Sequence, residues 1–198
     1  MGIFGKIQKG LIFIVSAPAG TGKTTLVEML ISEYPDEIKR SISCTTRPSR
    51  GSEQEGVDYF FVSEEEFEKK IKEGAFLEYA KVFKHYYGTL KETVKAFQNE
   101  GKHVFLVIDT QGALQLKETL EAVFIFIAPP DIETLRRRLE HRHTDTESVI
   151  NLRISYAREE MDKAKYYDYI IMNDDLYKAY KEFKILVEKK EKQLCQYI

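Results

Sequence analysis

The sequence lacks the features that mark secreted, disulfide-rich or membrane-spanning chains. It has only two cysteines, Cys44 and Cys195, and their spacing fits neither a disulfide framework nor a zinc site. Residues 1–10 lack the apolar core of a secretory signal peptide, and no apolar run is long enough to span a bilayer. These absences predict a reduced, cytoplasmic protein.

A large excess of charge of either sign is also missing. The 30 lysines and arginines nearly balance the 32 acidic residues, and the formal net charge of −2 argues against general binding to nucleic acids or membrane surfaces. The arginines are unevenly spread, however, because six of the nine lie between Arg136 and Arg158. With 198 residues, 43% of them hydrophobic, the chain is expected to form one domain that handles anions locally.

Residues 16–25, Ser-Ala-Pro-Ala-Gly-Thr-Gly-Lys-Thr-Thr, are the most informative feature that is present. They follow an apolar run and precede a helical pattern, which is the strand–turn–helix context of a phosphate-binding P-loop. Gly20 and Gly22 allow a sharp turn in which successive backbone N–H groups point at one anion, and the start of the helix adds partial positive charge. Lys23 can place its ammonium between terminal phosphates, and the Thr24 hydroxyl can hold Mg²⁺.

Apolar strands alternate with helical patterns over most of the chain, which is typical of a parallel α/β sheet. The strands of this regular part are expected at about 11–16, 104–108, 123–128 and 169–172. Its helices are expected at about 24–34, 89–100, 131–141, 147–165 and from 175 onward. The helix at 89–100 is predicted to open with a capping box at Thr89.

Residues 38–88 break this alternation. Short strands are expected there at about 38–44, 58–62 and 76–83, with one helix that opens with a capping box at Ser63. We therefore predict an α/β fold in which a P-loop parallel sheet flanked by helices carries an inserted small α+β lobe and a helical lid. The predicted core comprises about 8–37, 89–135 and 164–198, the lobe about 38–88, and the lid about 136–163.

A second anion site is indicated by two arginines in a hydroxyl-rich loop. Arg47 and Arg50 are three residues apart, and guanidinium groups bind phosphate oxygens in a bidentate manner. Tyr59 and Tyr87 can add phenolic donors. Alone, this loop is also compatible with an ordinary solvated turn. Beside a P-loop, it predicts a second phosphate site that faces the first.

Three further features admit both a functional and a structural interpretation. Glu78 lies within an apolar strand, where the pattern alone favours a solvent-facing side chain. Arg138 and Arg142 share a helix face and Arg153 follows, so they could stabilise a moving phosphoryl group or pair with neighbouring glutamates. Asp109 ends an apolar strand, where a parallel sheet binds its ligands, and could orient Mg²⁺-bound water or contact substrate.

Taken together, these segments resemble guanylate kinases, from about Leu11 to about Lys184. The matching motifs, in family order, are the P-loop, Thr45-Thr46-Arg47 with Arg50, Gly56-x-Asp58-Tyr59, Phe76-Leu77-Glu78, Tyr86-Tyr87-Gly88-Thr89, Asp109-x-Gln111-Gly112, Ile127-Ala128-Pro129-Pro130 and Asn173-Asp174-Asp175. The sequence departs from the family at Ala17, in place of the first P-loop glycine, at the shifted Pro48, and at Val107, where many members have aspartate.

The resemblance implies transfer of the γ-phosphoryl group of MgATP to GMP, and also to dGMP, in purine nucleotide metabolism. It implies an ATP site at Ala17, Pro18, Ala19, Gly20, Thr21, Gly22, Lys23, Thr24 and Thr25, with Thr24 on Mg²⁺. It implies a GMP site at Ser43, Arg47, Arg50, Tyr59, Glu78, Tyr87, Thr89 and Asp109. It implies that the catalytic cations are Lys23, Arg50, Arg138, Arg142 and Arg153. It implies no nucleic-acid, membrane or obligatory protein partner.

The expected choice of base also has a physical reason. Guanine presents N1–H and an exocyclic amine on one edge, and the carboxylate of Glu78 can accept hydrogen bonds from both, with Ser43 donating to O6. Adenine has a lone pair at N1, which would face the carboxylate unfavourably. By analogy with base-edge recognition, a bidentate pair of this kind discriminates by roughly 1–3 kcal/mol.

Three alternatives remain open from the sequence. Domains similar to guanylate kinases also serve as binding modules for phosphorylated peptides, but such modules typically lose the P-loop residues that are kept here as Gly22 and Lys23. A kinase for a non-guanine phosphate would not need Ser43 together with Glu78. A nucleic-acid-binding NTPase is disfavoured by the balanced charge.

Overall fold

The computed structural model describes residues 9–82, 84–141 and 146–195, and it confirms the predicted α/β fold. The described strands are β1 (Ile12–Ser16), β2 (Ile38–Arg40), β3 (Cys44–Thr45), β4 (Phe60–Phe61), β5 (Phe76–Val82), β6 (His85–Leu90), β7 (His103–Val107), β8 (Val123–Ala128) and β9 (Tyr169–Met172). The described helices are α1 (Lys23–Glu33), α2 (Glu64–Lys72), α3 (Lys91–Asn99), α4 (Thr110–Leu116), α5 (Ile132–Glu140), α6 (Glu147–Asp162) and α7 (Leu176–Cys195), with a 3₁₀ turn, η1 (Lys163–Tyr166), after α6.

The larger sheet is five-stranded and wholly parallel, in the order β2-β7-β1-β8-β9. Every residue of its central strand β1 is buried. Phe13 and Val15 face the core shared with α1 and α7, whereas Ile12 and Ile14 face the core shared with α3 and α4. Burial of both faces explains why this strand is apolar without interruption.

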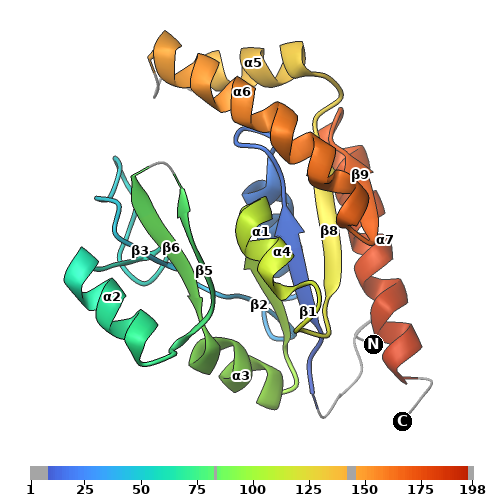
Figure 1. Cartoon of the computed structure of the whole chain (residues 1–198). Coiled ribbons are helices and arrows are strands. Elements are labelled where there is room, and N and C mark those ends of the chain that lie inside the picture. Colours follow the sequence, from blue (N-terminus) through green and yellow to red (C-terminus); the bar gives the residue numbers. More distant parts are fainter. Residues whose placement is uncertain (1–8, 83, 142–145, 196–198) are drawn as a thin grey trace.

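The smaller sheet has the order β4-β3-β6-β5 and lies with α2 at one side of the molecule (Figure 1). Its core is aromatic, with the rings of Phe67 and Phe76 stacked at a centroid distance of 4.4 Å. Helix α2 begins with the predicted capping box, because Ser63 accepts from Glu66 N while the Glu66 carboxylate accepts from Ser63 N. The local capping signal was therefore sufficient for this helix.

Helices α5 and α6 pack on each other and run across the top of the molecule in the view of Figure 1. The small core between them is formed by Leu135, Leu139, Ile150, Ile154 and Ala157. A Cβ placed on Gly20 would lie 2.9 Å from Leu139 and 3.3 Å from Leu135. The turn after β1 thus packs directly against α5, which leaves no room for a side chain at position 20.

Several sequence-based boundaries differ from the structure. The strand expected at 38–44 is two strands in different sheets, because β2 pairs with β7 whereas β3 pairs with β4 and β6. The small sheet consequently starts at Cys44 and ends at Leu90. The division of the chain into a core, a lobe at about 38–88 and a lid stays a prediction.

The capping box predicted at Thr89 is wrong. Thr89 lies in β6, and α3 begins after Leu90 without a side-chain cap. Strand β6 and helix α4 were not predicted as separate elements. The predicted helix at 147–165 ends at Asp162 and continues as η1. Among the described helices, none combines the length and apolar character needed to cross a membrane.

Candidate active site

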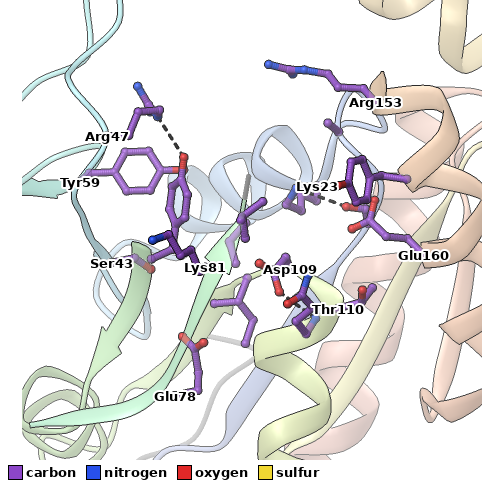
Figure 2. A pocket seen from close by; sticks show the side chains of 18 of the residues that line it. Lys23, Ser43, Arg47, Tyr59, Glu78, Lys81, Asp109, Thr110, Arg153 and Glu160 are labelled. Atoms are coloured by element: carbon purple, nitrogen blue, oxygen red, sulfur yellow. Dashed lines mark hydrogen bonds between the residues drawn. The ribbon is translucent and has the colours of Figure 1, made fainter. Parts of the chain in front are cut away.

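A cavity of about 480 Å³ opens between the P-loop, the smaller sheet, the start of α4 and the helix α6 (Figure 2). The predicted site residues that line it are Ala17, Ala19, Lys23, Ser43, Arg47, Arg50, Tyr59, Glu78, Tyr87, Asp109 and Arg153. In Figure 2, Arg47 and Tyr59 lie on one side and Lys23 on the other. The structure therefore brings both predicted anion-binding clusters to one cavity, on opposite walls.

Other predicted site residues do not line this cavity. They are Pro18, Gly20, Thr21, Gly22, Thr24, Thr25, Thr89 and Arg138. Thr24 and Thr25 are exposed at the start of α1 and line a second, open cavity on its outer face. Arg142 lies outside the described residues.

The P-loop adopts the backbone that its glycines predict. Gly20 and Gly22 have φ angles of +93° and +92°, in the left-handed region that side chains disfavour. Thr21 N donates to Pro18 O at 3.2 Å, which closes the turn between them. Lys23 is the first residue of α1, and its Nζ donates back to Ala17 O at 3.4 Å. The ammonium group therefore lies over the loop whose N–H groups it is predicted to assist.

Arg47 is buried and anchored by several acceptors. Its Nη1 and Nη2 donate to the two carboxylate oxygens of Glu53 at 2.9 and 2.8 Å, Nη1 also donates to Pro48 O, and Nε donates to the Tyr87 hydroxyl at 3.2 Å. The Glu53 carboxylate also accepts from Arg50 N at 2.7 Å. Although burial opposes it, the Arg47 partnership holds the pKa of Glu53 below its ordinary value. Glu53, to which the sequence reasoning gave no role, thus organises both arginines of the loop.

The aromatic side chains of this wall are packed edge to face. The rings of Tyr59 and Tyr87 have centroids 6.0 Å apart, and Arg47 Cζ lies 5.3 Å from the Tyr59 centroid. Burial raises the pKa of Tyr59, and the neighbouring Tyr87 adds to this effect. The Tyr59 phenol is therefore a neutral donor at physiological pH.

Glu78 is buried, with 5% of its surface exposed, so the solvent-facing interpretation of the sequence pattern is wrong. The pairing of β5 with β6 shifts register between Phe76 and Glu78. Phe76 stacks on Phe67 of α2, whereas Glu78 lies beside Gly112 of α4, where an added Cβ would come within 2.3 Å of Oε2. In a regular strand, Phe76 and Glu78 would face the same side of the sheet, because side chains alternate with a period of two. The β-bulge between them breaks this alternation, so the two side chains contact different helices.

The environment of Glu78 disfavours its charge. Burial raises its pKa to about 7, the Thr89 hydroxyl donating to Oε1 opposes the rise, and the Asp109 carboxylate adds to it. Asp109 itself caps α4, because its Oδ1 accepts from Gln111 N at 2.7 Å and Gly112 N at 2.8 Å. The carboxylate of Asp109 is thereby held at the strand end where the sequence placed it.

Helix α6 contributes residues that the sequence reasoning did not single out. Tyr156, Glu159 and Glu160 line the cavity with Arg153. Burial raises the pKa of Glu160 to about 7, Lys23 opposes this, and Asp109 adds to it. The spacing of 153, 156 and 160 places these side chains on one helix face, and this signal could have identified them from the sequence.

Arg138 projects from α5 to the loop between β9 and α7. Its Nη1 donates to Asn173 O at 2.9 Å and its Nη2 donates to Asp174 O at 3.0 Å. The guanidinium group is therefore held by backbone carbonyls next to the P-loop.

Comparisons with known proteins agree with this geometry. The sequence model of the family described as guanylate kinase matches residues 9–190. Guanylate kinase of Protochlamydia amoebophila is 54% identical over 176 residues, which cover 89% of each chain. Guanylate kinase of Neisseria meningitidis serogroup A is 49% identical over 181 residues, covering 91% of this chain and 88% of that protein.

A solved structure shows the same likeness in three dimensions. The crystal structure of guanylate kinase from Anaplasma phagocytophilum superposes with a TM-score of 0.75 at 31% identity, covering 96% of this chain and 89% of that one. The resemblance inferred from the motifs is thus confirmed over nearly the whole chain. This chain belongs to the guanylate kinase family of enzymes.

Proposed function

We propose that this protein transfers the γ-phosphoryl group of MgATP to GMP, giving ADP and GDP. The observation that carries the proposal is the shared cavity, in which Lys23 of the P-loop faces a wall formed by Arg47, Tyr59 and Tyr87, with Glu78 at its end. The names of the similar proteins support the same activity. A phosphoryl donor and a phosphorylated acceptor can then meet between the two walls.

Guanine would be read by Glu78 and Ser43, which line the same cavity. The ionised carboxylate of Glu78 accepts from N1–H and from the exocyclic amine, and Thr89 holds Oε1 from behind at 2.6 Å. We assign the acceptor phosphate to Arg47, Arg50, Tyr59 and Tyr87. None of these roles requires a 2′-hydroxyl, and we therefore include dGMP among the acceptors.

The acceptor phosphate oxygen attacks the γ-phosphoryl group in line, without a covalent enzyme intermediate. Catalysis of this kind rests on positioning and on neutralising charge. We assign the charge neutralisation to Lys23, Arg138 and Arg153, together with Arg50 and with Arg142, which lies outside the described residues.

Magnesium is expected to arrive with ATP. Within the described ranges, no group of three or more His, Cys, Asp or Glu side chains is placed to hold a metal ion. A single hydroxyl, that of Thr24 at the exposed start of α1, fits Mg²⁺ that is otherwise held by phosphate oxygens and water. When bound, the ion neutralises phosphate charge.

A coupled assay of ADP release tests the proposal. Purified protein with ATP and Mg²⁺ is given GMP, dGMP, AMP, CMP or UMP in separate reactions. We expect turnover with GMP and dGMP and little with the others. ADP release that does not depend on GMP would refute the proposed function. Recycling of GMP, a cytoplasmic location and the absence of an obligatory partner remain predictions.

A further inference from the structure

Asn173 connects two segments that are far apart in sequence. It follows β9, is 4% exposed, and its Nδ2 donates to Thr21 O at 2.7 Å across 152 positions of sequence. Its own backbone N–H donates to Ala128 O at 2.8 Å, which ties the residue to the end of β8. The Asn173 side chain is thus held by the main sheet and reaches the P-loop.

The orientation of the Asn173 amide follows from what it faces. Thr21 O is an acceptor, so the NH₂ group must face it, because two oxygens at this distance would repel each other. The Asn173 Oδ1 then points away, into a buried position. The contact is specific for a side chain that carries a donor at this point.

The contact fixes a peptide plane of the P-loop. In a trans peptide, the carbonyl of Thr21 and the N–H of Gly22 point in opposite directions. Because Asn173 holds the carbonyl on one side, the Gly22 N–H is turned to the other side. Thr21 N donates to Pro18 O, so the peptide before Thr21 is restrained as well.

The N–H of Gly22 lies at the start of α1, where it can bind an anion. Gly22 is the N-cap of α1, with its carbonyl accepting from Leu26 N at 3.1 Å and its φ at +92°. An N-cap N–H lies outside the helix's own hydrogen bonds and is free for an anion. A Cβ on Gly22 would come within 2.7 Å of Asn173 Nδ2, so the two residues are in close contact.

We propose that Asn173 is a positioning residue for phosphate binding, which holds the Thr21–Gly22 peptide so that the Gly22 N–H faces the phosphates of ATP. This inference rests on the proposed function, because that function makes the P-loop the ATP site. The backbone carbonyls of Asn173 and Asp174 also accept hydrogen bonds from the Arg138 guanidinium. The loop that contains Asn173 and Asp174 therefore orients the Gly22 N–H of the P-loop and holds the Arg138 guanidinium of α5.

Two substitutions test the role, and a third serves as control. Asn173→Asp keeps the shape but turns an oxygen toward Thr21 O, and Asn173→Ser shortens the side chain so that the contact is lost. Asn99→Asp makes the same chemical change at an exposed residue at the end of α3. Calorimetric titrations with ADP and with GMP give the two dissociation constants for each protein.

We expect ADP binding to weaken roughly 10- to 100-fold in both Asn173 variants, the range for loss of a buried hydrogen bond that leaves its acceptor unpaired. GMP binding should stay within twofold of wild type, and Asn99→Asp should match wild type for both ligands. In protein labelled with ¹⁵N-glycine and ¹³C-carbonyl threonine, the Gly22 amide signal is identified because Thr21-Gly22 is the one Thr-Gly pair in the sequence. This signal should shift with ADP in wild type and much less in Asn173→Asp.

The outcomes separate the two proposals. Wild type that neither binds ADP nor phosphorylates GMP refutes the proposed function. An active wild type with Asn173 variants that bind ADP normally refutes the positioning role alone. Equal weakening of ADP binding and GMP binding, with a lowered melting temperature, assigns Asn173 a structural role and also refutes the positioning role. If Asn173→Asp does not fold, Asn173→Ser gives the same comparison.

Discussion

The hydroxyl of Thr89 donates a 2.6 Å hydrogen bond to Oε1 of Glu78, and both side chains are buried. The two residues are directly paired across β5 and β6. On the other side of the carboxyl group, Gly112 leaves space that a side chain would fill. The position of this carboxyl group is therefore set by a strand neighbour and by a helix.

The close approach of α4 predicts the effect of adding a methyl group. In Gly112→Ala, the new Cβ would lie 2.3 Å from Oε2 of Glu78, so the carboxyl group must move. We expect the KM for GMP to rise roughly tenfold or more, as for loss of a charge-assisted hydrogen bond, with little change in the KM for ATP. Steady-state kinetics with each substrate varied in turn provides the measurement. An unchanged KM for GMP would show that Glu78 does not read the base.

Removing the charge of Glu78 tests its role in base choice directly. Glu78→Gln replaces one acceptor oxygen by a donor, which faces guanine N1–H or its amine unfavourably. The ratio of kcat/KM for GMP to that for AMP should fall roughly 10- to 100-fold. The protein should stay folded, because burial already disfavours the charged carboxylate. A constant ratio would remove Glu78 from the base site.

The raised pKa of Glu78 predicts a pH dependence of GMP binding. Its pKa is about 7, so the carboxylate that accepts from guanine is present above pH 7 and is lost as the pH falls. Between pH 7 and pH 6 the ionised fraction falls from about one half to about one tenth, so the KM for GMP should rise about fivefold. The phosphate of GMP also titrates near pH 6, and Glu160 on the same cavity has a pKa of about 7. Glu78→Gln serves as the control because it retains both of these contributions and lacks only that of Glu78. Identical profiles for the two proteins would contradict the prediction.

Lys23 is predicted to be essential for turnover. Its ammonium lies over the P-loop, within 3.4 Å of Ala17 O, and on the wall opposite Arg47. Lys23→Ala should lower kcat by roughly 10²- to 10³-fold, the range for removing one preorganised electrostatic contact to the transition state. Lys95→Ala, on the exposed face of α3, is the matched control and should behave as wild type. Near-normal turnover of Lys23→Ala would contradict the assignment.

The burial of His103 predicts a loss of stability in acid. Its Nδ1 accepts from Leu11 N at 3.0 Å, its side chain is 1% exposed, and burial lowers its pKa to about 4. Between pH 6.5 and 4 the unfolded chain binds a proton that the folded chain does not. The stabilisation is therefore complete above pH 6.5 and falls by about 3 kcal/mol toward pH 4.

Urea unfolding between pH 4 and pH 7.5 measures this effect. In His103→Gln, the free energy of unfolding should no longer fall by this amount between pH 6.5 and pH 4, whatever the stability of the variant at neutral pH. His85→Gln, at a histidine that is only partly buried, is the matched control substitution. A slope that survives in His103→Gln would assign the acid sensitivity to other groups.

Much of the fold could be predicted because local rules suffice for it. The apolar run of β1, the glycine turn after it and the capping box at Ser63 each depend on residues a few positions apart. Backbone sterics and short-range hydrogen bonds act over that distance. The same rules failed at Thr89, because its hydroxyl bonds to Glu78 across the sheet instead of capping α3.

By itself, then, the sequence determined the P-loop, the alternation of buried strands and helices, and the chemistry available at each wall of the cavity. Only the tertiary structure decided that Glu78 is buried beside Gly112, that Glu53 holds Arg47, and that Asn173 reaches Thr21. The physical reason is strand register and helix packing. A single bulge in β5 redirects a side chain, and a contact across 152 positions exists only after the sheet has assembled.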